Sequence, residues 1–167
     1  QIRKEDDKST RNELKKGLPA ICFSGQFKKR ADDAIIEHSG LICLDFDGYE
    51  NSGLMLEDKH AMTQNPYVMS VFVSPSGNGL KVIVKIPAEP DNHKRYFEAL
   101  QEHFDSKYFD VTSKNISRVC YESSDPDMYI NMESDVWTEL AELEGKTVDK
   151  YDVTTTIPVT DEGVIIE

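Results

Sequence analysis

The alternation of apolar and polar residues is strongest in two segments of the chain, LICLDFD (41–47) and LKVIVKI (80–86). Because successive side chains of a strand point to opposite faces, this alternation predicts two strands that each bury one face. The apolar face is expected to carry Leu44, Phe46, Val82, Val84 and Ile86. The opposite face is expected to carry Cys43, Asp45, Asp47, Lys81, Ile83 and Lys85. Each strand should therefore be buried on one side and present polar groups on the other.

Other segments have helical or strand-like patterns. Helices are expected over 3–16, near 31–37, over 52–64 with Ser52 as N-cap, over 91–104 with Asp91 as N-cap, and over 134–143. Strands are expected over 18–25, 67–73 and 116–122, with a turn at SPSGNG (74–79). From residue 41 to 122 the order is β-α-β-β-α-β, which is the split βαβ pattern of RNA-recognition-type folds.

This order predicts an α+β fold and a division of the chain. In the RNA-recognition-like arrangement the first and third strands are antiparallel neighbours at the centre of the sheet, both helices cover one face, and the other face is open. We expect residues 1–17 to form an N-terminal helix and residues 18–143 to form one domain. Within it, a small αβ unit (18–40) should pack across a cleft from the βαββαβ unit (41–131). Residues 144–167 are expected to be an acidic linker or tail.

Composition and charge narrow the functional classes. The three cysteines, Cys22, Cys43 and Cys120, lie far apart in apolar stretches, which favours reduced core thiols over a disulfide framework or a zinc site. The sequence has no long apolar run or secretory leader, so a cytoplasmic protein without a membrane partner is expected. The net charge of −12 argues against nucleic acid, but residues 132–167 carry −8 of it and leave −4 on residues 1–131. Lys15, Lys16 and the run 28–30 are basic clusters of a kind that is usually solvated surface.

The candidate chemistry lies where the two alternating strands are expected to meet. Asp45, Asp47 and Lys81 should converge at one edge of the sheet, beside the glycine-containing turn 74–79. Two carboxylates at i and i+2 on a rigid strand can share Mg²⁺ or Mn²⁺, which favour carboxylate oxygen. A lysine and a turn with accessible backbone N–H groups would suit a nucleoside triphosphate opposite the metal. Asp110 could supply a third carboxylate for a two-metal phosphoryl displacement.

The segments LDFD, SPSGNGLKV, YFD and ISRVCYESSDP together resemble the archaeo-eukaryotic primase superfamily, in its primase-polymerase branch. The likeness is greatest to the N-terminal domain of virulence-associated-E-like proteins of bacteria and mobile elements. LPAICFSGQF also suits that group, so the resemblance covers residues 18–131.

The resemblance implies roles for particular residues. The metal and catalytic carboxylates would be Asp45, Asp47 and Asp110. Lys81 stands where the wider superfamily has the histidine of a Ser-x-His motif that contacts the nucleotide. The remaining nucleotide-binding residues implied are Ser76, Gly77, Gly79, Arg118 and Ser123.

The resemblance also implies an activity and partners. The activity would be template-directed DNA primase and polymerase chemistry in the replication of a bacterial or mobile-element genome, with Mg²⁺ or Mn²⁺ as cofactor. The substrates would be nucleoside triphosphates and a single-stranded DNA template. A helicase-like region in the same or a partner chain would accompany this domain.

Two other classes fit part of the sequence. The first is a nucleic-acid-binding module with weak or no catalysis. Against it, modules of the RNA-recognition type stack bases on aromatic residues of the open face, whereas the expected open face here holds carboxylates, Cys43 and Ile83. The second is a haloacid-dehalogenase-type phosphatase with Asp45 as nucleophile and Asp47 as acid/base. Against it, Tyr49 stands where that motif has a small hydroxyl residue, and the alternating βα units of such an enzyme are not seen.

Overall fold

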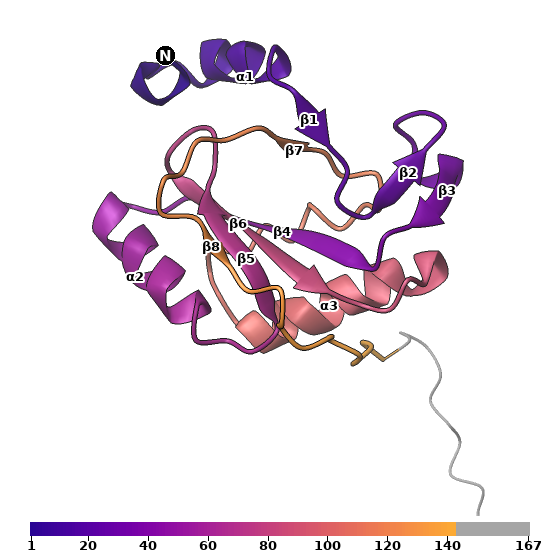
Figure 1. The fold of residues 1–167 in the computed structure, drawn as a ribbon. Helices are drawn as coiled ribbons and strands as arrows, with labels where there is room; N and C mark the ends of the chain where they lie inside the picture. Colours follow the sequence, from indigo (N-terminus) through magenta and orange to yellow (C-terminus); the bar gives the residue numbers. More distant parts are fainter. Residues whose placement is uncertain (143–167) are drawn as a thin grey trace, which may run out of the picture.

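The computed structural model describes residues 1–142 and has a mixed α+β fold (Figure 1). Its α-helices are α1 (Lys8–Lys16), α2 (Ser52–Met62) and α3 (His93–Phe104). Its strands are β1 (Ala20–Ile21), β2 (Gly25–Phe27), β3 (Ile35–His38), β4 (Leu41–Asp47), β5 (Val68–Val73), β6 (Gly79–Lys85), β7 (Cys120–Tyr121) and β8 (Tyr129–Ile130). Short 3-10 helices lie at Ile2–Lys4, Asp32–Ala34 and Pro90–Asn92.

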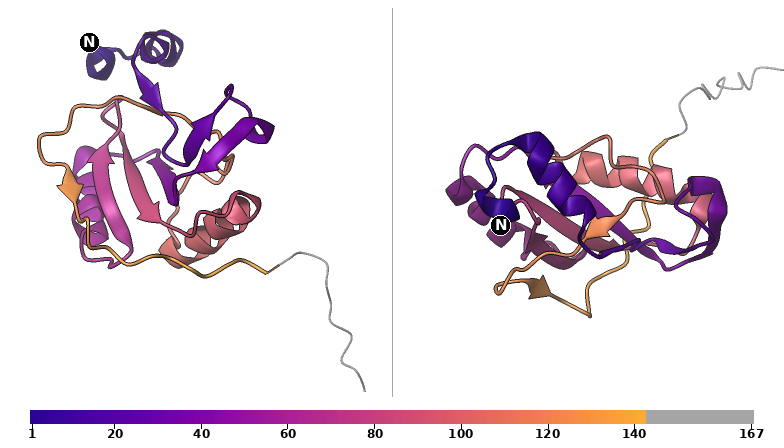
Figure 2. Two further views of the ribbon diagram at one scale, coloured as in Figure 1. Left: turned by 45° about the vertical axis from the view of Figure 1, so that its right-hand side comes forward. Right: turned by 90° about the horizontal axis from the view of Figure 1, so that it is seen from above.

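A four-stranded antiparallel sheet in the order β4-β6-β5-β8 forms the centre of the molecule. The expected pairing of 41–47 with 80–86 is confirmed, with Asp45 opposite Lys81 and Asp47 opposite Gly79. Helices α2 and α3 lie against one face of the sheet (Figures 1 and 2). The predicted apolar faces are also confirmed, because the main core contains Leu44, Phe46, Val82, Val84 and Ile86. Alternation along β4 and β6 thus places the aspartates on the side away from these helices.

The opposite face of the sheet is covered, where the sequence predicted an open one. The short strands β1 and β7 pair with each other and cross this face as a two-stranded ribbon (Figure 1). Between the ribbon and the sheet, Cys120 of β7 packs with Cys43, Phe72 and Ile83 to form a second small core. An apolar cavity of about 560 Å³ lies beside this core. The β1–β7 ribbon therefore partly shields the polar side of β4 from solvent.

The fourth strand predicted at 116–122 is the main error in topology. Only residues 120–121 of that segment form a strand, and they pair with β1 outside the central sheet. Strand β4 is consequently an edge strand, flanked by residues 108–110. There the Asp47 N–H donates to the Tyr108 carbonyl at 2.8 Å and the Asp110 N–H donates to the Asp45 carbonyl at 2.8 Å. The chain then turns away at Asp110, whose carbonyl accepts from the Ser113 N–H, so the pairing with β4 stops after a single bridge.

Several local predictions are also corrected. Residues 31–37, expected to be helical, form a 3-10 turn and strand β3, which pairs with β2. Residues 134–142, expected to begin a helix, have no helical structure, and Trp137 packs into the main core instead. The N-cap of α2 is Asn51 rather than Ser52, and α3 begins after Asn92 rather than at Asp91.

The predicted N-terminal helix is α1 with a preceding 3-10 turn. No helix within residues 1–142 has the length and apolar character needed to cross a membrane. The linker or tail predicted for 144–167 lies outside the described residues.

Candidate functional site

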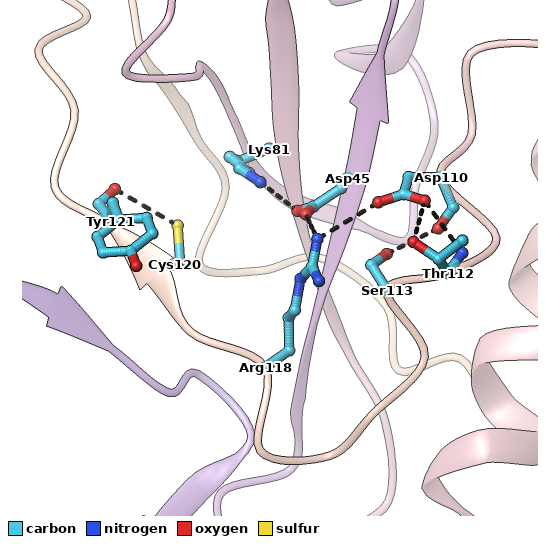
Figure 3. A network of polar contacts seen from close by, with 8 residues as sticks. All are labelled: Asp45, Lys81, Asp110, Thr112, Ser113, Arg118, Cys120 and Tyr121. Atoms are coloured by element: carbon cyan, nitrogen blue, oxygen red, sulfur yellow. Dashed lines mark hydrogen bonds and ion pairs between the residues drawn. The ribbon is translucent and has the colours of Figure 1, made fainter. Parts of the chain in front are cut away.

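Three carboxylates meet at the edge of the central sheet, as the sequence predicted. Figure 3 shows two of them, Asp45 and Asp110, with the cations that contact them. Asp45 lies in the middle of β4 and is 1% exposed, while Asp47 is exposed at the end of the same strand. Asp110 is brought to them because residues 108–110 run beside β4. One oxygen from each of the three side chains lies within 4.8 Å of the others. The backbone pairing of β4 therefore determines the geometry of the cluster.

The donor set fits a hard divalent cation such as Mg²⁺ or Mn²⁺, which prefers carboxylate oxygens. Separations of up to 4.8 Å allow the oxygens to share one ion after small side-chain rotations, or to bridge two ions about 3.5–4 Å apart. Oδ1 of Asp45 is buried and accepts no hydrogen bond of good geometry from residues 1–142. Its partner among these residues is the Lys81 ammonium group, which a bound metal ion would have to displace.

Two cations neutralise part of the cluster. The Lys81 Nζ lies 2.5 Å from Asp45 Oδ1, as an ion pair whose angle falls outside hydrogen-bonding geometry. The Arg118 Nη2 donates to Asp45 Oδ2 at 2.7 Å and lies 3.3 Å from Asp110 Oδ2. Burial opposes the charge on Lys81 and on Arg118, but the carboxylates outweigh it, chiefly that of Asp45, and the pKa of both side chains is raised. Both stay protonated, so three carboxylates face two fixed positive charges.

Asp47 differs from Asp45 in its charged partners and in the space around its carboxylate. It has no ion pair among the described residues, and desolvation raises the pKa of its carboxyl group despite the nearby Lys81 charge. Gly79 is its register partner, and a Cβ there would lie 2.2 Å from Asp47 Oδ1. Glycine at this position therefore leaves the space that the Asp47 carboxylate occupies.

The turn 74–79 forms one wall of the site. Gly77 has φ +79°, a left-handed conformation that glycine adopts without strain. The Ser76 side chain is buried and lines the clefts on both sides of Asp47. The Ser74 hydroxyl is buried without a hydrogen-bond partner in residues 1–142. Unsatisfied hydroxyls beside a lysine and an arginine could donate to phosphate oxygens.

The first of these clefts has a volume of about 340 Å³ and is lined by the Asp45 and Asp47 carboxylates, Lys81 and Arg118. Its far wall is α1, which contributes Lys15, together with Arg30. Burial lowers the pKa of Lys15, although the Asp47 carboxylate acts in the opposite direction. The second cleft, of about 560 Å³, opens on the other side of Asp47 and is also lined by α1.

The structure brings together most of the residues predicted for nucleotide binding. Ser76, Lys81 and Arg118 line the first cleft, with Gly77 and Gly79 in the adjoining turn. Ser123 is placed elsewhere, because its hydroxyl donates to the Val73 carbonyl at 2.5 Å and its side chain lines the apolar cavity.

Helix α1 contributes cations to the site that were not predicted from the sequence. Of its basic residues, only Lys15 and Lys16 were considered, as part of a solvated surface cluster. Lys8, Arg11, Asn12 and Lys15 nevertheless recur at i, i+3, i+4 and i+7. That spacing marks one face of a helix and could have indicated a cationic wall.

Comparison with known proteins assigns the chain to a family. The model of the BT4734-like, N-terminal domain family matches residues 13–130, which is well over half of the chain. This range includes β4, the turn 74–79, Asp110 and β7. No curated protein and no solved structure matches the chain. The chain belongs to the BT4734-like N-terminal domain family.

Proposed function

We propose that this domain is a template-directed nucleotidyltransferase of the primase-polymerase type, with nucleoside triphosphates and a single-stranded DNA template as substrates. The observation that carries the proposal is the convergence of Asp45, Asp47 and Asp110 with Lys81 and Arg118 on one cleft. Phosphoryl transfer requires positioning and charge neutralisation more than covalent chemistry, and this set provides both. The chain order β4-α2-β5-β6-α3, followed by residues 108–110 beside β4, supports a modified RNA-recognition-like unit as the scaffold.

Each side chain has a role in this proposal. Divalent ions held by the three carboxylates would activate the attacking hydroxyl and stabilise the leaving pyrophosphate. Lys81 and Arg118 neutralise Asp45 in the absence of a ligand, and they can donate to phosphate oxygens when a metal ion takes over that neutralisation. The Ser74 and Ser76 hydroxyls lie in the same cleft and provide further donors. The residues thus change partners when the substrate enters, and none has to leave the cleft.

The two alternative classes fit the structure less well. A phosphatase nucleophile must reach the substrate phosphorus, but the Asp45 side chain is 2% exposed and is held by two cations. Base stacking on the face of the central sheet would need Cys43 and Ile83 to be accessible, but both are buried beneath the β1–β7 ribbon. The binding module also leaves unexplained why three carboxylates share one site.

Calorimetric titration with a nucleoside triphosphate in the presence of Mn²⁺ tests the proposal. Lys81→Ala should weaken binding by about tenfold or more, since a charge-assisted hydrogen bond contributes about 1.5–3 kcal/mol. Lys81→His should retain part of the affinity, because imidazole can donate to a phosphate oxygen. Lys94→Ala, which removes a lysine from the exposed surface of α3, serves as the matched control.

A primer-extension assay on a single-stranded template completes the test. Extension should depend on Mn²⁺ or Mg²⁺ and should be lost in Asp45→Asn and Asp110→Asn. A wild-type protein that binds no triphosphate but binds single-stranded nucleic acid would support the binding module instead. Release of phosphate from a simple phosphoester, abolished by Asp45→Asn, would support the phosphatase.

A further inference from the structure

One face of α1 is cationic and is directed at the second cleft. Lys8, Arg11, Asn12 and Lys15 follow the i, i+3, i+4, i+7 spacing of a single helix face, and all four line this cleft together with Asp47 and Asp110. Figure 2 shows α1 lying over the central sheet, and the residues that line the cleft come from α1 and from the segment 107–110 beside β4. The helix and the carboxylates therefore form two opposing walls.

Packing does not account for this face. No residue of α1 is buried, so the helix contributes no side chain to either core. It is held by the segments on either side of it. Arg3 of the preceding 3-10 turn donates to the Ser124 carbonyl at 2.5 Å and packs on Gly77, and strand β1, which follows the helix, pairs with β7. A polar helix that is held away from the core, with its cations directed inward, is better explained by a ligand than by stability.

Among the described residues, the cations of this face have no carboxylate partner, although the Arg11 Nη1 donates to the Glu5 carbonyl at 3.4 Å. Within residues 1–142, no carboxylate lies within ion-pair distance of Lys8, Arg11 or Lys15. Lys107, on the opposite wall, is by contrast paired with Glu50 at 2.8 Å. Three unpaired cations at helical spacing match the regular negative charges of a phosphodiester backbone, and Asn12 adds a neutral hydrogen-bonding group.

We propose that the cleft between α1 and residues 107–110 holds the phosphate backbone of a single-stranded nucleic acid, beside the first cleft that takes the triphosphate. This inference rests on the proposed function and adds the path of the strand. Because both clefts open on Asp47, a strand lying in the second cleft ends at the carboxylates, where its terminal hydroxyl meets the triphosphate. Asp47 and Asp110 repel that strand until they are neutralised, so Mn²⁺ should strengthen strand binding.

Fluorescence anisotropy with a labelled oligothymidylate tests the inference on the full chain. The double variant Lys8→Gln, Arg11→Gln should lose at least about tenfold in affinity at low salt, as expected for two lost phosphate contacts. The slope of log affinity against log salt should fall by about 1.4, because each contact to a single strand contributes about 0.7. The control is Lys28→Gln, Lys94→Gln, which removes the same charge from exposed positions outside both cleft linings.

Triphosphate titration on the same variants separates this inference from the proposed function. Retained Mn²⁺-dependent triphosphate binding in Lys8→Gln, Arg11→Gln, with the selective loss of oligothymidylate binding, supports a separate strand cleft. Unchanged oligothymidylate affinity, an equal loss in the control, or no binding to wild type would overturn the inference. If wild type still binds triphosphate in that case, the proposed nucleotidyltransferase function is retained and only the strand cleft is refuted. If wild type binds no triphosphate, the proposed function itself is refuted.

Discussion

Asp45→Asn removes a buried negative charge that holds two cations, so it is expected to unfold the domain more easily as well as to abolish its chemistry. Asparagine has nearly the same shape, but its amide cannot neutralise both Lys81 and Arg118. Removing one partner of a buried ion pair costs about 3–5 kcal/mol, because the remaining charge stays desolvated. The Lys81 and Arg118 side chains are 13% and 31% exposed and can partly rehydrate, which favours the lower end of this range. We expect a loss of about 3 kcal/mol, or about 6–12 °C in melting temperature for a domain of this size.

Urea denaturation at neutral pH measures this loss, with Asp33→Asn on the exposed surface as the matched control. A second variant, Lys81→Met in the Asp45→Asn background, tests the mechanism by removing one of the unneutralised cations. The double variant should recover about 0.5–3 kcal/mol relative to the sum of the two single losses. A loss below about 1 kcal/mol for Asp45→Asn, or strictly additive effects in the double variant, would refute the argument that charge neutralisation stabilises this site.

Three further results are expected. Asp47→Asn should keep or slightly raise the melting temperature, because the cleft walls around this otherwise exposed residue desolvate its carboxyl group and raise the pKa of that group. The substitution should also abolish the rise in melting temperature produced by Mn²⁺, as thermal melts with and without the metal would show. Gly79→Ala should lower the melting temperature and weaken its rise with Mn²⁺ in the same melts, because the new Cβ would lie 2.2 Å from Asp47 Oδ1. The control is Gly17→Ala, which should have little effect because the nearest atom to a Cβ there lies at 3.5 Å. Burial lowers the pKa of His38, and it lowers the pKa of His93 to about 4. Because the folded domain then binds fewer protons than the unfolded chain, its stability should fall from about pH 6.5 towards pH 4. Denaturation at several pH values should show a shallower fall for His93→Gln.

The sequence was sufficient to predict the part of the site that depends on strand alternation. Each of the two seven-residue strands has apolar residues at every second position, so only one of its two faces can be buried against the helices. Asp45 and Lys81 therefore had to share the other face. The antiparallel pairing then placed them opposite each other. Asp110 joins the cluster by a different route from the predicted one, because residues 108–110 themselves lie beside β4 and the strand predicted at 116–122 does not enter the central sheet.

The β1–β7 ribbon that covers the sheet could not be predicted from strand alternation. Strands β1 and β7 have two residues each, which is too short to show a period, and their pairing depends on contacts between distant segments. The 3-10 turn at Asp32 is likewise stabilised from far away, because its carboxylate accepts from the Ser117 N–H at 3.0 Å. Local propensity favoured a helix there, and tertiary hydrogen bonds produced a different conformation.

The pairing of β1 with β7 also has a consequence during synthesis. Ala20 and Tyr121 are register partners, so about 100 residues must be added after the first before the second exists. At typical translation rates of about 5–20 residues per second, this interval is roughly 5–20 s. A nascent chain that ends before Tyr121 contains α1 and all three carboxylates but has no ribbon to hold the helix over the sheet. The clefts on either side of Asp47 are thus among the last features of the domain to form, although the helix that lines both of them is made before the central sheet.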